Sequence, residues 1–392
     1  MYIFSVFDCD NLTKISNFTS AKPSLMSSMP LKDIALTFVP QLGSRGAAYL
    51  VETFGSAEAL YAASMQEIIE RTDLHESIAR EIVSGRGLRE AERELEYCRR
   101  HAITPVGATD PRYPALLREV EDRPAVLYVR GNVEALSRRA VAFVGTRKIS
   151  SYGQRACDEM VRSLVEAVPD VVIVSGLAYG VDAACHRAAL ACGATTIGVV
   201  ANPLPAVTPT VHTHLAEDMI AHGGAIVTEL NSQCKQNGRY YIPRNRIIAA
   251  MAAGTVVVES PEAGGSLSTA AFADGYNRSV MAVPGRITDT NSRGCNLLIR
   301  NRRAQAVLSG RDVAEELMWE LGVGPQESVP ERQPLTEDEE RLMSFFDTDP
   351  LTIDQLQERS GVSLGELSLT LMTLELSGAI RQLPGKRYEK LL

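Results

Sequence analysis

The middle of the chain alternates short apolar runs with longer amphipathic segments. The apolar runs between Ala140 and Gly285 read AVAFVGT, VVIVSGL, TTIGVVA, AIVTEL, TVVVES and VMAVPG. Segments of helical length lie between them, at 151–167, 180–192, 244–253 and 266–275. Buried Val/Ile runs that alternate with helices predict an α/β fold with a doubly wound, mostly parallel sheet. Such sheets bind ligands beyond the carboxyl ends of their strands, so we expect the chemistry in the turns there.

A different pattern precedes this region. Residues 30–105 read as short helices, and the stretch FVPQLGSRGAAYLVETFGSAEALYAAS places apolar residues near the 3.6-residue period on both sides of a glycine turn at 42–44. This pattern resembles a SAM-like or helix-hairpin-helix unit. The amides of such a turn can contact a DNA backbone, but the charge of this stretch is balanced, which favours structural packing or a partner contact.

The end of the chain forms a third block. Residues 323–334 are rich in proline, glycine and charge, as expected of a linker. Residues 335–392 then read as a helix, a short helix, a turn at 360–362, a longer helix, and two strands that turn at a Pro-Gly pair. That order predicts a winged helix. Residues 106–322, which hold the predicted sheet and a lead-in segment, form the central domain.

The composition is that of a globular protein. The 392 residues are 45% hydrophobic and 22% charged, and no run approaches the ~20 apolar residues of a membrane helix. No basic segment precedes the apolar start, so we predict no signal peptide and a cytoplasmic location. The Ser/Thr-rich residues 1–29 fit no periodic element, which indicates a disordered tail or a non-native extension with Met26 or Met29 as the working start.

The seven cysteines show no C-x-x-C pair and no Cys/His ligand spacing. We therefore predict no metal site and no disulfides, with the cysteines present as buried thiols. The chain also shows no cofactor motif, because its glycine-rich turn near residue 264 lacks the Gly-Lys-Ser/Thr of a P-loop.

Charge is distributed unevenly. Residues 1–139, 140–310 and 311–392 carry 17, 15 and 8 basic against 19, 12 and 17 acidic residues, which gives net charges of -2, +3 and -9. Within the middle block, residues 235–303 hold 10 basic and 4 acidic residues. The whole chain is acidic at -8, yet one local surface is basic, and such a surface attracts anions.

Four strand-end turns carry candidate binding residues. The first, VGTRKISSYG, places Gly145, Thr146 and Arg147 between a buried strand and a helix capped by Ser150 or Ser151. Free amides at the helix start, a hydroxyl and a guanidinium together predict an anion site. Good helix capping is the plainer explanation of the same residues.

The second turn, SGLAYGVDAACHRAAL, sets Asp182 and His186 four residues apart on one helix face. The two could be metal ligands, but no third ligand accompanies them. An Asp–His hydrogen bond that orders the turn is therefore the expected role.

The third turn, PEAGGSLSTAAF, opens a helix with Gly264, Gly265 and Ser266, followed by Thr269. Glycines permit a close approach to the backbone, and the hydroxyls suit a phosphate. This turn is a second candidate for anion binding.

The fourth stretch, RYYIPRNR, packs three arginines and two tyrosines into residues 239–246. We expect residues 244–246 at a helix start and residues 239–241 on the loop before it. Arginine forks match phosphate oxygens and tyrosine faces accept bases, a combination that suits single-stranded nucleic acid. At least one of these arginines should instead form a structural pair with Glu229 or Glu259.

In combination, these motifs resemble the DNA-processing protein A family, also called DprA or Smf. The strings VAFVGTRKISSYG, VVIVSGLAYGVDAACHRAAL, YYIPRNRIIAAM, VVVESPEAGGSLSTAA, VPG and GCNLLIR occur in the order and at about the spacing of that family. The segment DPRYPALLREVEDRPAVLYVRGN resembles its lead-in, and the two end domains resemble its SAM-like and winged-helix additions. Thr208, Tyr241 and Arg303 stand where the family usually has Tyr, Phe and Gly.

The resemblance implies a Rossmann-like core, a homodimer and no established catalytic activity. It implies binding of single-stranded DNA, protection of incoming DNA, and loading of the RecA recombinase in natural transformation and DNA recombination. From the turns and the resemblance, the expected DNA contacts are Gly145, Thr146, Arg147, Ser150, Gly176, Arg239, Tyr241, Arg244, Asn245, Arg246, Gly264, Gly265, Ser266, Thr269 and Asn296.

Two other functions stay open. Rossmann-like nucleoside-monophosphate phosphoribohydrolases carry Pro-Gly-Gly-x-Gly-Thr-x-x-Glu where this chain has PEAGGSLSTAAF. Phe272 stands in place of that motif's acid, and hydrolysis needs a carboxylate, which argues against the enzyme. A nucleotide-sensing adaptor is the other alternative.

The predicted winged helix is not expected to read DNA. Its longer helix, SLGELSLTLMTLELSG, contains no basic residue, whereas DNA-binding winged helices neutralise phosphates around this helix. Leu364, Leu367, Leu371 and Leu374 form a stripe that we expect in the core. The acidic face would then be free for a protein partner or for shielding the basic groove of the central domain.

Overall fold

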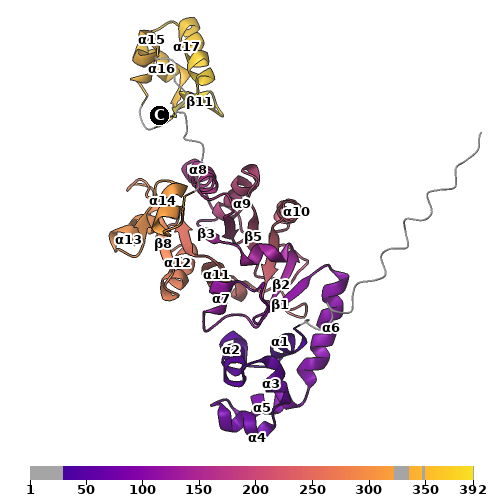
Figure 1. Cartoon of the computed structure of the whole chain (residues 1–392). Coiled ribbons are helices and arrows are strands. Elements are labelled where there is room, and N and C mark those ends of the chain that lie inside the picture. Colours follow the sequence, from indigo (N-terminus) through magenta and orange to yellow (C-terminus); the bar gives the residue numbers. More distant parts are fainter. Residues whose placement is uncertain (1–29, 322–334, 347–348, 392) are drawn as a thin grey trace, which may run out of the picture. The chain divides into compact units, whose positions relative to one another are not determined.

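Figure 1 shows a computed structural model of the chain, which describes residues 30–321, 335–346 and 349–391. The predicted extension 1–29 and the predicted linker 323–334 lie outside the described residues. The chain divides into two compact units, the first ending at Gly322 and the second beginning at Val323.

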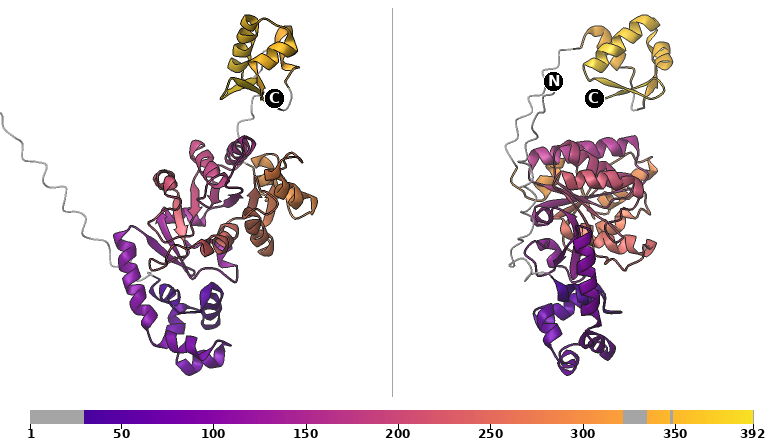
Figure 2. Two further views of the ribbon diagram at one scale, coloured as in Figure 1. Left: turned by 180° about the vertical axis from the view of Figure 1, so that it is seen from behind. Right: turned by 90° about the vertical axis from the view of Figure 1, so that its right-hand side faces the viewer.

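The first unit is built on one large sheet (Figures 1 and 2). Its strands are β1 (Thr104–Gly107), β2 (Val126–Gly131), β3 (Ala140–Val144), β4 (Val172–Ser175), β5 (Thr196–Val199), β6 (Ala225–Thr228), β7 (Gly254–Val257), β8 (Ser279–Ala282) and β9 (Gln305–Ala306). They lie in the order β1-β2-β6-β5-β4-β3-β7-β8-β9. Strands β3 to β9 are parallel, whereas β1 and β2 extend the β6 edge antiparallel. The predicted mostly parallel, doubly wound sheet is confirmed.

Helices cover both faces of this sheet. One face carries α7 (Ala115–Arg118), α11 (Tyr241–Met251), α12 (Ser266–Gly275) and α13 (Arg293–Arg300). The other carries α8 (Ser151–Ala167), α9 (Val181–Ala191), α10 (Thr213–Ala221) and α14 (Gly310–Glu316). Short 3-10 helices are η2 (Val133–Ser137), η3 (Thr210–His212), η4 (Gly238–Tyr240) and η5 (Thr290–Ser292).

Strand β3 shows why the strand sequences are apolar throughout. Ala142 and Val144 pack in the α11 layer, whereas Val141 and Phe143 pack in the α8 layer, and all four are buried. Successive side chains of a strand point to opposite faces, so a strand covered on both faces must be apolar at every position.

The order of the strands creates a switch point between β3 and β7. The chain lays down β3 to β6 in one direction and then returns to place β7 on the other side of β3. The connections after β3 and β7 therefore diverge, which opens a crevice at their carboxyl ends. The first and third predicted turns, after β3 and β7, both lie at this crevice.

Six helices precede the sheet, shown in indigo and purple in Figure 1. They are α1 (Leu31–Leu36), α2 (Gly43–Phe54), α3 (Ala57–Ala62), α4 (Met65–Arg71), α5 (Glu76–Val83) and α6 (Arg86–Arg100). Gly43 has a φ of 63°, a left-handed conformation that favours the glycine of the predicted turn. Ile34 and Leu95 share an apolar cluster with Tyr128 and Ile226 of the sheet, so these helices pack on its β2–β6 side. The proposed boundary at residue 105 stays a prediction.

The second unit contains α15 (Glu337–Met343), α16 (Ile353–Ser360) and α17 (Leu364–Leu376) with strands β10 (Leu351–Thr352), β11 (Ile380–Leu383) and β12 (Arg387–Lys390). The strands lie in the order β10-β12-β11, and β11 and β12 form the wing. The predicted winged helix is confirmed.

The predicted leucine stripe of α17 is wrong at one end. Leu367, Leu371 and Leu374 are buried, but Leu364 is 50% exposed. Leu364 is the first residue of the helix, directly after the capping Ser363. Because helical side chains lean toward the N-terminus, its side chain extends beyond the end of the core.

The six cysteines that the structure describes are free thiols. Burial is confirmed for Cys98, Cys157, Cys185 and Cys295, but Cys192 and Cys234 are only half-buried. Cys192 follows the last turn of α9 and Cys234 lies in a loop, where packing is incomplete. Across the described ranges, no helix is long and apolar enough to span a membrane, and no cluster of His, Cys, Asp and Glu could hold a metal ion.

Candidate nucleic-acid interface

A concavity of about 290 Å³ opens at the switch point, beyond the ends of β3 and β7. The turns after β3 and β4, the turn before α12, and the first turns of α11 and α12 line it. It contains ten of the expected DNA contacts: Gly145, Thr146, Arg147, Tyr241, Arg244, Asn245, Gly264, Gly265, Ser266 and Thr269. The topology thus joins all four predicted stretches into one surface.

An arginine–tyrosine pair marks the rim of this concavity. The guanidinium carbon of Arg147 lies 5.2 Å from the ring centroid of Tyr241, within the range of a cation–π contact. Arg147 is exposed and forms no salt bridge with any residue that the structure describes. Its guanidinium, which carries five N–H donors, therefore lies on an exposed side chain next to a half-buried aromatic ring. This combination can hold a phosphate and a stacked base at once.

The glycine-rich turn forms the opposite wall. Gly265 immediately precedes α12, and a Cβ built on it would meet no atom within 4 Å, so its backbone is open to a ligand. Helix α12 begins at Ser266, and the first turn of a helix leaves N–H groups that favour an anion. Asn245 Nδ2 donates to Ser268 Oγ at 3.0 Å and ties the starts of α11 and α12 together.

A buried positive charge lies at the floor. Arg244 is buried, its Nη1 donates to the Val199 carbonyl, and its Nε donates to Asn245 Oδ1 at 3.2 Å. Burial lowers the pKa of Arg244 and raises the pKa of Asp182, while the charge of each side chain opposes the shift of the other. The pair places a cation close to the concavity without exposing it.

Gly176 is required for this arrangement although it does not line the concavity. A Cβ at Gly176 would come within 2.3 Å of Asp182 Oδ2 and 2.9 Å of both Nη atoms of Arg244. Glycine at this position therefore makes room for the guanidinium. Its role is to position Arg244, which differs from the DNA contact expected from the sequence.

The prediction that the helix start at Ser150 has free amides for an external anion is wrong. Glu259, from the turn after β7, occupies the start of α8: the Ser150 amide donates to Oε2 at 2.9 Å and the Ser150 hydroxyl to Oε1 at 2.5 Å. Glu259 is only 2% exposed. An internal carboxylate therefore takes the place of the external anion, since both satisfy helix-terminal amides in the same way.

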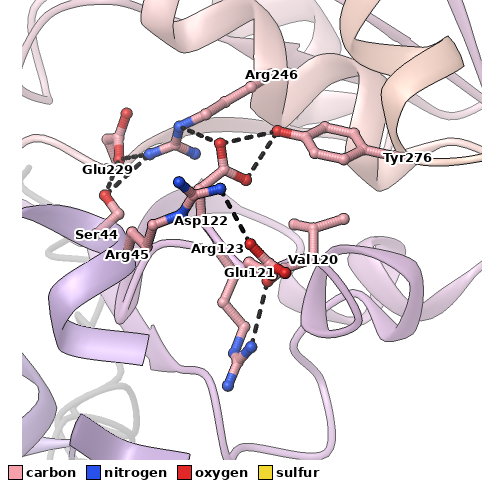
Figure 3. A network of polar contacts seen from close by, with 9 residues as sticks. All are labelled: Ser44, Arg45, Val120, Glu121, Asp122, Arg123, Glu229, Arg246 and Tyr276. Atoms are coloured by element: carbon pink, nitrogen blue, oxygen red, sulfur yellow. Dashed lines mark hydrogen bonds and ion pairs between the residues drawn. The ribbon is translucent and has the colours of Figure 1, made fainter. Parts of the chain in front are cut away.

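Arg246 is also used internally. Its guanidinium pairs with Glu229, donates to Ser44 Oγ at 3.0 Å, and lies 3.8 Å from Asp122 Oδ2 (Figure 3). It lies two positions after Arg244, which turns its side chain by about 200° on a helix with 3.6 residues per turn. The expected arginine–Glu229 pair is confirmed, and this network gives Arg246 a structural role in place of the predicted DNA contact.

Two further expectations are corrected. Asn296 forms two hydrogen bonds with the backbone of Gly285, at 3.0 and 3.1 Å, and so fixes the loop after β8 instead of facing the concavity.

The predicted Asp182–His186 hydrogen bond is absent. His186 Nε2 donates to the Gly176 carbonyl at 2.6 Å, while Asp182 Oδ2 accepts from the Ala178 amide at 3.2 Å. Both side chains bond the backbone of the turn, so each orders it separately.

Helix α11 begins three residues earlier than predicted, at Tyr241. Pro243 falls in the first turn, where its missing N–H is tolerated because first-turn amides have no intrahelical acceptor. Tyr241 is consequently held by helix geometry. Arg239, in η4, is exposed and lies outside the 290 Å³ concavity.

The apolar lining was not predicted. Ile242, 61% exposed, contributes to the rim, and Pro261, Ala178 and Ile248 contribute to the walls. Apolar residues at strand and helix ends carry no distinguishing sequence signal, because most such residues simply belong to the core. Only the three-dimensional arrangement shows that they surround the polar groups.

Comparison with known proteins assigns the chain to a family. A family model described as DNA recombination-mediator protein A matches residues 104–318, more than half of the chain. The chain belongs to the DNA recombination-mediator protein A family. A second model, described as the DprA winged helix domain, matches residues 326–386 of this family member.

Named relatives agree with this assignment. The chain is 32% identical over 320 residues to "Protein Smf" of Escherichia coli, covering 77% of this chain and 84% of that protein. It is 38% identical over 208 residues to "DNA processing protein DprA" of Streptococcus pneumoniae, covering 53% and 72%. The crystal structure of the Streptococcus pneumoniae protein is similar with a TM-score of 0.64 at 28% identity, covering 74% of this chain and 98% of that one.

Proposed function

We propose that this member of the family binds single-stranded DNA in the concavity at the switch point and presents it to a recombinase of the RecA type. The observation that carries the proposal is the exposed Arg147, which lies over the Tyr241 ring and faces the glycine-rich start of α12 across the concavity. These groups match the two parts of a nucleotide that every strand repeats, the phosphate and the flat base.

The concavity suits a single strand better than a duplex. A base can stack on the Tyr241 ring only if it is not enclosed in a helical stack, and a backbone phosphate can reach Arg147 and the open amide of Gly265. Stacking and phosphate contacts carry little base information. We therefore infer binding without sequence preference.

We infer that the protein binds DNA without cleaving it. Asp182 is the one carboxylate that lines the concavity in the described part of the chain, and it is buried beside Arg244 and bonded to the turn. Phe272, at the position of the phosphoribohydrolase acid, stacks on Tyr276 with 6.2 Å between ring centroids. Incubation with AMP should release no purine. Release of purine would favour the alternative function, a nucleoside-monophosphate phosphoribohydrolase.

The recombinase partner is a further part of the proposal, supported by the family's description as recombination mediators. A homodimer is proposed on the family resemblance of the sequence motifs alone. We expect the protein to accelerate filament formation by a RecA-type recombinase on single-stranded DNA already covered by another binding protein. We also expect a dimer by light scattering. A monomer, or no acceleration, would contradict these two parts separately.

The test of DNA binding uses oligothymidine and fluorescence anisotropy at several salt concentrations. Arg147→Ala should weaken binding and reduce the salt slope by about one unit, because one phosphate contact is lost. Arg187→Ala removes an exposed arginine outside the concavity and serves as the matched control. If Arg147→Ala binds like the unmodified protein at every salt concentration, as the control Arg187→Ala is expected to, the concavity is not the binding site.

The aromatic contact has its own test. Tyr241→Ala should weaken binding about 5- to 100-fold if the ring stacks on a base, whereas Tyr241→Phe should bind almost normally because it keeps the ring. Equal losses in the two variants would show that the hydroxyl, not the ring, makes the contact.

A further inference from the structure

A second, larger concavity lies next to the first. It measures about 550 Å³, a size typical of ligand sites, and lies between the N-terminal helices and the sheet. Arg45 and Leu36 line it from the helices, and Asp122 and Leu230 line it from the core. Residues 239 and 240 line this concavity, whereas Tyr241, the next residue, lines the smaller one. One short segment therefore borders both.

This segment repeats the arginine–tyrosine pairing of the first site. The guanidinium carbon of Arg239 lies 5.0 Å from the ring centroid of Tyr240, close to the 5.2 Å between Arg147 and Tyr241. Arg239 is exposed, donates to Tyr240 Oη at 3.0 Å, and forms no salt bridge within the described ranges. Each pair offers a stacking plane together with unused N–H donors.

The charges around the second concavity favour a base inside and a phosphate at the rim. Arg246 lies between Glu229 and Asp122 (Figure 3) and balances one of their two negative charges, and Arg45 pairs with Glu121 at the surface, with 3.0 Å between Nη2 and Oε2. The interior thus keeps a net negative charge, which disfavours a phosphate there.

We propose that the second concavity is a continuation subsite for the same single strand, in which Tyr240 stacks on a base and Arg239 holds an adjacent phosphate. The inference rests on the proposed function, since it extends the strand from Tyr241 over residue 240 toward the N-terminal helices. A strand that fills only the first concavity does not reach Tyr240, so the two subsites are distinguished by oligomer length.

The test compares oligothymidines of about 4 and about 16 nucleotides, a span over which single-strand binding sites vary. Tyr240→Ala should leave affinity for the short oligomer unchanged and weaken the long oligomer about 5- to 100-fold. Tyr240→Phe should restore long-oligomer binding. Arg239→Ala should reduce the salt slope for the long oligomer only, whereas Lys235→Ala, which removes an exposed charge outside both concavities, should not.

The outcomes separate this inference from the proposed function. If Tyr241→Ala weakens both oligomers while Tyr240→Ala weakens neither, the first concavity binds DNA and the continuation subsite is overturned. If Tyr241→Ala also has no effect, the proposed function itself fails. Equal losses from Lys235→Ala and Arg239→Ala would show a general charge effect and would also overturn the subsite. Unchanged short-oligomer binding by Tyr240→Ala confirms that this variant is folded.

Discussion

The Rossmann-like core and the winged helix are both architectures that can bind nucleic acid, yet in this chain their exposed helix surfaces differ in chemistry. At the switch point of the core, Arg147 lies over Tyr241 beside the open amide of Gly265. On α17, the exposed side chains include Leu369 and Met372, at 72% and 64% exposure, and the helix contains no basic residue.

Architecture alone therefore does not assign the DNA site within one chain. A phosphate backbone needs cations and free donors, and α17 offers apolar and acidic groups instead. Exposed apolar side chains on a helix are more typical of contacts with other proteins. The function is set by the groups at particular helix starts, and the fold only determines where those starts meet.

The largest expected effect is on the stability of the first unit, through Arg246. Arg246→Ala leaves Glu229 and Asp122 without their cation in a mostly buried network, which should destabilise the first unit by about 3 kcal/mol. Calorimetry should show a lower unfolding temperature for the first unit and an unchanged unfolding temperature for the winged helix. An unchanged first transition would mean that the network contributes nothing to stability. Arg187→Ala, exposed on α9, is the control.

The next effect concerns DNA affinity. Combining Arg147→Ala with Tyr241→Ala should weaken single-stranded DNA binding on the order of 100-fold, since a phosphate contact and a stacked base are lost together. Thermal unfolding should be nearly unchanged, because Arg147 is exposed and Tyr241 only half-buried. Normal DNA binding by the double variant would contradict the difference between the core and the winged helix, because the core would then not bind single-stranded DNA through these residues.

A third difference depends on pH. Burial lowers the pKa of His186 in the core to about 4, so the folded state stays neutral while the unfolded chain takes up a proton below pH 6.5. The contribution of neutral His186 to the free energy of unfolding is therefore complete above pH 6.5 and is lost as the pH falls toward 4. At pH 5 the loss is ~2 kcal/mol. The second unit contains no histidine and should not show this loss.

The measurement for this prediction is the stability of the unmodified protein minus that of His186→Gln, at pH 7 and pH 5. Taking the difference cancels other titrating groups, including Asp33, whose pKa burial raises to about 7 and which acts in the opposite direction. An equal difference at both pH values would contradict the proposed neutral histidine.

The smallest expected effect concerns the winged helix. Deleting residues 325–392 should leave single-stranded DNA affinity unchanged or slightly raised, because this segment holds 7 basic and 13 acidic residues and so carries a net charge of -6. Replacing Lys386 and Arg387 on the wing with alanine should also change affinity less than about twofold. Tight duplex binding by the isolated segment in a gel shift at moderate salt would contradict this expectation.

Much of the site could be predicted because its residues follow strands with a clear pattern. Gly145 and Arg147 follow the buried run of β3, and Gly265 directly precedes the helix that follows β7; a doubly wound sheet brings such positions together. The order of the strands was the only further information needed to place these turns on one crevice.

An internal arginine–glutamate pair could be predicted, but which polar groups are used internally could not, because that depends on partners distant in the sequence. Nothing in the sequence distinguishes Arg244 from Arg246, but only Arg246 contacts Glu229 and Ser44. The start of α8 has the residues of an anion site, yet Glu259 from another turn already fills it. Such competition between internal and external partners is decided by tertiary packing, not by local residue type.

The central claim is that a single strand binds at the switch point of the core. A crystal structure of the protein with a short oligothymidine tests it most directly. We expect a base stacked on Tyr241 and a phosphate between Arg147 and the amide of Gly265 at the start of α12. A strand seated on α17 or the wing, with the concavity beyond β3 and β7 left empty, would contradict it.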